Sequence, residues 1–215
     1  MADISRAARS WGLVVGVGNA APEAAEAGAG VIALEGAPKA CRGGNSRHTR
    51  NFRCMHPGPL SVLTDTSNEE ESFDDLMRVM EGKTDEHLAC SAFHHSEACL
   101  PWLEPRGGRF QPSLSGTLSL GRTNAFFLCG GKALVNAVYN TAEDLGMRIA
   151  CQARVRHLGI HSRRFAHMHP EVSDIPCRIA GRAVVWPRAA FRATSTGWPS
   201  PGGRRRAPSL FAACP

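Results

Sequence analysis

A glycine-rich turn near the N-terminus has the residue types that bind a dinucleotide. The segment Gly16–Ala21 reads GVGNAA and follows the apolar run Leu13–Val15, so it fits the pattern G-x-G-x-x-G/A. In this pattern the first glycine allows a tight turn, the second lets backbone N–H groups approach a pyrophosphate, and the last small residue lets helix and strand pack closely. A phosphate at the helix N-terminus would meet backbone donors and the positive end of the helix dipole.

The turn needs a strand before it, a helix after it and a second strand to complete the unit. A second apolar run, Val31–Leu34, ends in Glu35, about 20 residues after Gly16, where an acidic residue accepts hydrogen bonds from a ribose hydroxyl. Pro22 falls in the first helical turn, where a missing N–H costs little, and Gly28 ends the helix. The spacing predicts a β-α-β dinucleotide unit; the alternative is an Ala/Gly-rich turn without a ligand.

Two further blocks are less generic. RGGNSRHTRNFRCMH spans Arg42–His56, and a long segment spans Cys99–Gly146, in which Lys132–Gly146 has the apolar face of a helix. With the opening GNAA, these blocks resemble the FAD-binding portion of the fumarate reductase and succinate dehydrogenase flavoprotein family. The resemblance implies an α/β fold: a Rossmann-like FAD-binding domain with a β-α-β dinucleotide unit and accessory helices, incomplete in this chain.

The same resemblance implies the residues that contact FAD. They form the pyrophosphate turn, the acceptor for the adenosine ribose, a loop that runs beside the pyrophosphate toward the flavin, and an adenine contact on a later strand. In that order they are Gly16, Gly18, Asn19, Ala20 and Ala21, then Glu35, then Gly43, Gly44, Asn45 and Ser46, and finally Val155.

The resemblance also implies an oxidoreductase that moves a hydride from a small tricarboxylate to FAD. Arginines should hold the acid groups of such a substrate, because a guanidinium pairs bidentately with a carboxylate. The available arginines are Arg47, Arg50, Arg53 and Arg122; each has the alternative of a solvated surface position. The proton-transferring residue is expected in a part of the family that this chain does not cover, and a membrane protein is a possible electron acceptor.

The sequence departs from the family pattern after Val185. The family continues there as LASGGF, whereas this chain reads WPRAAF. In one choice of codons for VVLASGGF, deleting one C from the leucine codon changes the translated sequence to VVWPRAAF. We therefore interpret the break as a frameshift. An intact reading frame across Val185 in the gene would contradict this interpretation.

We therefore expect residues 1–10 to be an N-terminal extension and 11–185 a partial FAD-binding domain of the FAD-dependent oxidoreductase 2 type. Residues 186–215 are expected to be an out-of-frame, disordered tail rich in Arg, Pro and Gly. The alternative function is a catalytically inactive FAD-binding fragment or a pseudogene-like remnant.

Composition excludes several other classes. The formal charge of +6 comes from seven arginines after Asp174, so the rest of the chain is close to neutral and no nucleic-acid partner is expected. No apolar run reaches the roughly 20 residues that span a bilayer, and no secretory signal is present, so a cytoplasmic protein with reduced cysteines is expected.

The histidines and the acidic run also have simple interpretations. No Cys or carboxylate joins the HMH at 167–169 or the other histidines at ligand spacing, so no metal site is expected. The region 67–103 is expected to form two helices, with Ser67 or Asn68 capping the first and Gly82 closing it.

Overall fold

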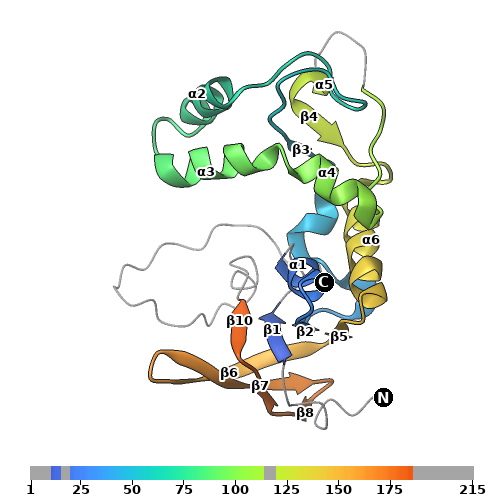
Figure 1. The fold of residues 1–215 in the computed structure, drawn as a ribbon, viewed down its shortest axis with the longest axis vertical. Coiled ribbons are helices and arrows are strands. Elements are labelled where there is room, and N and C mark those ends of the chain that lie inside the picture. The colour runs from blue at the N-terminus through green and yellow to red at the C-terminus, as the bar shows by residue number, and fades with distance from the viewer. Residues whose placement is uncertain (1–10, 16–19, 114–119, 186–215) are drawn as a thin grey trace. The chain divides into compact units, whose positions relative to one another are not determined.

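The computed structural model describes residues 11–15, 20–113 and 120–185 (Figure 1). These residues fall into two compact units. Unit 1 is the described part of Met1–Pro38 together with that of Ile149–Pro215, and unit 2 is the described part of Lys39–Arg148. The expected region 11–185 thus contains two units, with the second inserted between the two halves of the first. No helix in the described ranges is both long and apolar enough to cross a membrane.

Unit 1 begins with a strand, a helix and a strand that form a parallel β-α-β arrangement. Strands β1 and β2 pair in parallel, and β1 also pairs in parallel with β10. The sheet order is β10-β1-β2-β5. The elements are β1 (Trp11–Val15), α1 (Ala20–Glu26), β2 (Gly30–Leu34), β5 (Arg148–Ala150) and β10 (Ala183–Val185). The parallel pairing predicted for the first two strands is confirmed.

Helix α1 ends where the sequence indicated. Pro22 is its third residue and is buried, so its missing N–H lies in the turn that has no intrahelical acceptor. At the other end the Ala29 N–H donates to the Ala24 carbonyl (2.9 Å), and Gly28 has a φ of +81°, a left-handed conformation that glycine adopts without a steric penalty. The proline is therefore compatible with a seven-residue helix.

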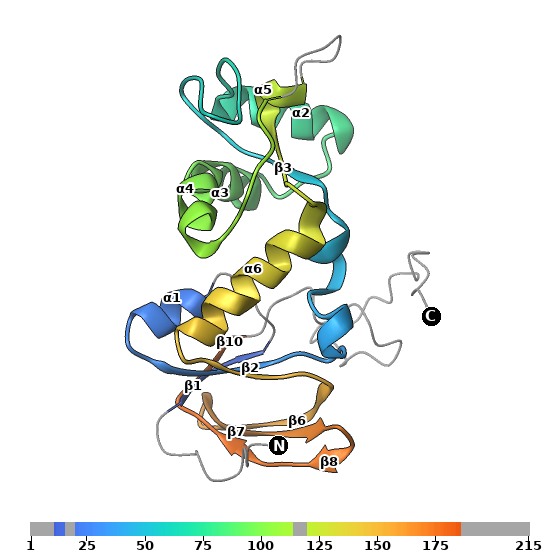
Figure 2. The ribbon, with the colours of Figure 1, turned by 90° about the vertical axis from the view of Figure 1, so that its right-hand side faces the viewer.

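A second, antiparallel sheet completes unit 1. Its central strand β7 pairs with β6, β8 and β9. Figure 2 shows α1 on one side of the parallel sheet and the antiparallel sheet on the other. The strands are β6 (Ala153–His161), β7 (Arg164–Val172), β8 (Ile175–Pro176) and β9 (Ile179–Ala180). Their buried side chains form one core with those of β2 and β5, namely Ile32, Leu34, Ala150, Ala153, Met168, Val172 and Ile179.

Unit 2 combines helices with a two-stranded antiparallel ribbon of β3 and β4. Its core beside this ribbon contains Cys54, Val62, Leu63, Leu100 and Ala125. The elements are η2 (Lys39–Cys41), η3 (Gly44–His48), β3 (Asn51–Arg53), α2 (Glu69–Val79), α3 (Glu86–Ser96), α4 (Cys99–Leu103), η4 (Glu104–Arg106), α5 (Leu120–Thr123), β4 (Asn124–Phe126) and α6 (Gly130–Asp144).

The helices predicted in unit 2 are present, and the structure adds the short helices α4 and α5. Asn68 caps α2, because its Oδ1 accepts a hydrogen bond from the Glu71 N–H (2.8 Å). The helix predicted over Lys132–Gly146 is α6, which begins two residues earlier. Where two helices were expected over 67–103, the structure has α2, α3 and the short α4, whose proline lies in its first turn and is tolerated there.

Candidate FAD site

Glu35 lies at the carboxyl end of β2 and is fixed by its neighbours. Its N–H donates to the Ala150 carbonyl (2.9 Å), and its own carbonyl accepts from the Ala153 N–H (2.9 Å). The carboxylate Oε1 accepts from the Ala37 N–H (2.9 Å). This local turn holds the half-buried side chain at the strand end, the position that a ribose-binding carboxylate occupies in a dinucleotide unit.

Val155 lies close to Glu35 in unit 1, because β6 starts at Ala153, the residue bonded to Glu35. In the β6–β7 ladder Val155 is opposite Pro170, and its half-buried side chain packs against the core that includes Met168. The structure thus brings together two of the residues predicted to contact FAD. It also gives the Val155 side chain a packing role that the sequence did not indicate.

Two of the remaining predicted residues of unit 1 lie at the start of α1. Ala20 is exposed at the first position of the helix, and Ala21 is fully buried. A buried alanine here agrees with the predicted need for a small residue where helix and sheet approach. Gly16, Gly18 and Asn19 lie outside the described residues.

The predicted loop Gly43–Ser46 belongs to unit 2, and its two glycines differ in their surroundings. Gly43 has a φ of +103°, and a Cβ added to it would overlap the side chain of Val135 on α6. Gly44 has a φ of +52°, and an added Cβ would meet nothing within 4 Å. Gly43 is therefore required by packing on α6, whereas no described atom covers the Gly44 backbone on the side where a Cβ would lie. Asn45 and Ser46 are exposed in η3.

Arg42 attaches this loop to α6. Its side chain is only 5% exposed, and its guanidinium carbon lies 4.1 Å from the centroid of the Tyr139 ring. Nε donates to Asn136 Oδ1 (3.3 Å) and Nη1 to Glu143 Oε1 (3.3 Å). The spacing of Asn136, Tyr139 and Glu143 puts them on one helix face, so all three side chains can reach the same arginine.

Two of the arginines predicted to bind substrate are paired with carboxylates of α2. Arg122 donates to both oxygens of Glu71, at 2.9 Å from Nη1 to Oε2, and Nη1 also reaches the Thr66 carbonyl (2.8 Å). Arg53 Nη1 donates to Asp75 Oδ2 (2.7 Å). Because Glu71 and Asp75 are one helical turn apart, the structure brings Arg53 and Arg122 to the same face of α2.

The ion pairs change the acidity of these groups. The hydrogen bonds from Arg122 lower the pKa of the Glu71 carboxyl, and the bond from Arg53 lowers the pKa of Asp75. In turn, the hydrogen bond to Glu71 raises the pKa of Arg122. All three shifts favour the charged forms that make the pairs.

The four predicted arginines differ in how many of their donors are paired. Arg53 has one paired nitrogen, and its buried Nε and Nη2 have no hydrogen-bond partner among the described residues. Arg50 is exposed, and its backbone carbonyl accepts from the Phe127 N–H (2.9 Å). Arg47 lies half-buried in η3. Arg53 is thus the paired arginine that retains donors for a further acceptor.

Acidification should weaken unit 2 through the Glu71–Arg122 pair. The folded-state pKa of Glu71 is lowered from 4.5. As the pH falls, Glu71 is therefore protonated in the unfolded chain before it is protonated in the folded chain. The stability that the pair contributes is lost as the pH falls below about 4.5. We expect urea unfolding, followed by circular dichroism, to show a smaller loss of stability between pH 7 and pH 4 in Glu71→Gln than in wild type.

Glu70→Gln is the matched control for this measurement. Glu70 is also in the first turn of α2 and is exposed, so it shares the helix dipole but has no ion pair in the described structure. An equal change in pH dependence for the two variants would assign the effect to the dipole and contradict the role of the pair.

Comparison with known proteins identifies the class of fold. No protein-family model matches the chain, and a comparison with curated proteins finds no match. Solved structures do match. The 3-ketosteroid-Δ4-(5α)-dehydrogenase of Rhodococcus jostii aligns with a TM-score of 0.66 and 21% identity, over 80% of this chain and 44% of that one. A flavocytochrome c3 fumarate reductase aligns with a TM-score of 0.67 and 22% identity, over 83% and 33%.

A third match, Sdh1 of Mycobacterium smegmatis, has a TM-score of 0.65 and 17% identity, over 88% of this chain and 36% of that one. The described residues therefore have the fold found in flavoprotein oxidoreductases, and the chain spans less than half of the length of each of these proteins. At these identities the likeness establishes the fold, and the chemistry has to be argued from the site.

Proposed function

We propose that this chain is the FAD-binding portion of a flavoprotein dehydrogenase of the tricarballylate dehydrogenase type, which oxidises tricarballylate to cis-aconitate. In that reaction the substrate loses a hydride to the flavin and a proton to a base. The observation that carries the proposal is the parallel β1-α1-β2 unit ending at Glu35, within a fold shared with flavoprotein oxidoreductases. The resemblance of Arg42–His56 to the fumarate reductase and succinate dehydrogenase flavoproteins supports it.

The residues around the proposed site fit FAD in several respects. Glu35 is held at a strand end, where its carboxylate can accept from the adenosine ribose, and β6 with Val155 begins next to it. Gly44 has open space around its backbone, as a loop that runs beside a pyrophosphate requires. FAD, when bound, would supply the hydride acceptor; the chain's own residues would orient it.

The proposed substrate contacts come from unit 2. A tricarboxylate needs several cations, and Arg50, Arg53 and Arg122 are the proposed partners, with Arg47 as a further choice. Arg53 keeps donors that have no partner in the described part of the chain, whereas Arg122 already donates to both oxygens of Glu71. The pairing of Arg122 with Glu71 leaves fewer cations for a substrate, so it favours an alternative function, a FAD-binding module without catalytic activity. An electron-accepting membrane protein is the proposed partner of the active form.

Purification of the chain in the presence of FAD tests the proposal. A yellow protein whose flavin absorbance bleaches on anaerobic addition of tricarballylate would support the dehydrogenase. A yellow protein that does not bleach would support the non-catalytic module, and a folded protein without bound flavin would overturn both.

Glu35→Gln should weaken FAD binding about tenfold or more, because a hydrogen bond to a charged acceptor contributes roughly 1.5–3 kcal/mol. Titration of the folded variant with FAD, followed by quenching of flavin fluorescence, measures the loss. Asp174→Asn is the control: Asp174 is an exposed acid of the same unit in a left-handed turn that asparagine tolerates. Equal affinity of wild type and Glu35→Gln would remove Glu35 from the proposed site.

A further inference from the structure

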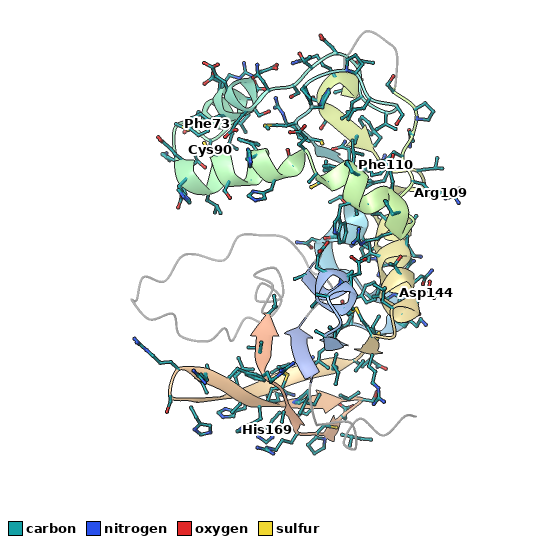
Figure 3. All side chains as sticks on the ribbon, in the orientation of Figure 1. Phe73, Cys90, Arg109, Phe110, Asp144 and His169 are labelled. Atoms are coloured by element: carbon teal, nitrogen blue, oxygen red, sulfur yellow. The ribbon has the colours of Figure 1, made fainter. Side chains whose placement is uncertain are left out.

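Four histidines meet on the β6–β7 hairpin of unit 1. In the antiparallel register His157 lies opposite His169, and Gly159 lies opposite His167. Leu158 and Met168, the residues between them, pack into the core, so the alternation of side chains directs the histidines to the other face of the sheet. Figure 3 labels His169 on this hairpin. The HMH of the sequence is thus half of a larger group.

The imidazole rings form a connected chain. His167 is central: its ring centroid lies 5.0 Å from that of His169 and 6.0 Å from that of His161. The centroids of His157 and His169 are 6.0 Å apart. The planes of His167 and His169 are perpendicular (90°), so these two rings are not stacked on each other.

Gly159 makes the space in which His167 lies. A Cβ added to Gly159 would overlap three atoms of the His167 ring, at 2.6 Å from Nδ1 and closer to the other two. The ring therefore lies directly over the glycine backbone. Beside it is a surface groove of about 390 Å³, lined by His157, Leu158, Gly159, Ile160, His161 and His167.

The spacing of the rings suits a shared transition-metal ion. Imidazole nitrogen binds such an ion at about 2.0–2.1 Å, so the centroids of two rings on one ion are about 4.5 Å apart at a right angle and about 6.4 Å apart when the rings are opposite each other. The separation of 5.0 Å between His167 and His169 lies between these two values. The groove lining has no carboxylate, which disfavours Mg²⁺ and Ca²⁺ and leaves ions that prefer nitrogen.

We propose that His167 and His169 bind one divalent transition-metal ion of the Ni²⁺ or Cu²⁺ type, with water in the other coordination positions and His157 and His161 as flanking imidazoles. The proposal is limited to two protein ligands, because within the described ranges no three His, Cys, Asp or Glu side chains are arranged to hold a metal ion. Of the two proposed ligands, His167 lines the groove, and the His169 ring lies beside it, with the two ring centroids 5.0 Å apart.

Titration of the untagged, full chain with Ni²⁺ by calorimetry tests the site. We expect one bound ion per chain and an affinity at least about tenfold lower in His167→Gln and in His169→Gln. Mutation of a residue that only hydrogen-bonds to a metal ligand already lowers metal affinity about 10–100-fold, so loss of a ligand should cost at least as much. Circular dichroism of each variant checks that the fold is kept.

His95→Gln controls for the other pair of neighbouring imidazoles. His94 and His95 on α3 have ring centroids 5.5 Å apart, so they are the competing explanation for any ion that binds. Unchanged affinity in His95→Gln would support the hairpin site. No Ni²⁺ binding by the wild type, or a loss of binding in His95→Gln with none in the His167→Gln, His169→Gln double variant, would overturn the proposal. The outcome is independent of flavin binding.

Discussion

Replacing Gly131 by alanine is expected to destabilise unit 2 by about 2–3 kcal/mol, the cost of forcing an extra carbon into a packed interior. Gly131 is buried in the first turn of α6, and its N–H donates to the Thr49 carbonyl (2.7 Å). An added Cβ would lie 2.7 Å from the Thr49 carbonyl oxygen and closer still to that of Ser46. Both obstacles are backbone atoms, so no side-chain rotation relieves the overlap.

Hydrogen exchange of the α6 amides in wild type and Gly131→Ala measures this effect within unit 2. Gly58→Ala is the matched control, because Gly58 belongs to the same unit, has no left-handed φ and would meet nothing within 4 Å of an added Cβ. Its substitution should be neutral or stabilising by up to about 1 kcal/mol. Equal exchange rates in the two variants would show that η3 does not constrain α6.

Arg42→Ala is expected to cost about 3 kcal/mol. The change removes a desolvated cation–π contact with Tyr139, worth about 2 kcal/mol, and hydrogen bonds to Asn136 and Glu143 worth about 1 kcal/mol. The packing of the arginine stem is also lost. Since Arg42 precedes Gly43, the loop proposed to approach FAD should also lose its fixed position on α6.

Lys39→Ala gives the appropriate comparison. Lys39 pairs with the same Glu143 carboxylate (3.7 Å), but its side chain is 71% exposed. A solvent-exposed pair contributes about 0–1 kcal/mol, so this variant should keep nearly all of the stability. Urea unfolding of both variants, followed by circular dichroism, measures the difference. Similar losses in the two variants would show that burial of Arg42 contributes little.

Local features of the fold were predictable because they depend on neighbouring residues. Asn68 is a good helix cap beside an amphipathic run, and Pro22 and Gly28 are consistent with a short helix between two apolar runs. The parallel pairing of β1 with β2 follows from the strand-helix-strand pattern. The third short helix α4 was not predicted, since CLPWL is too short for a helical period to be recognised.

The candidate site was predictable only in part. The place of Glu35 at a strand end was predictable because the strand and the spacing from the first glycine can be counted along the chain, and its contact with FAD stays a prediction. The ion pairs of Arg53 and Arg122 with α2 were not predictable, because their partners lie 22 and 51 positions away in the sequence. The same applies to Gly43, whose need for a small residue comes from Val135 on a distant helix.

The sequence by itself determined the β-α-β pattern, the longer helices of unit 2 and the resemblance to FAD-binding proteins, and it predicts the dinucleotide turn, because these depend on periodicity, turn residues and short spacings. The tertiary structure decided which polar groups are paired and which histidines meet. His157 and His161 reach His167 and His169 only through the register of an antiparallel hairpin, and Arg42 reaches Tyr139 only when its loop packs on α6. Such contacts depend on the packing of elements, which no local pattern encodes.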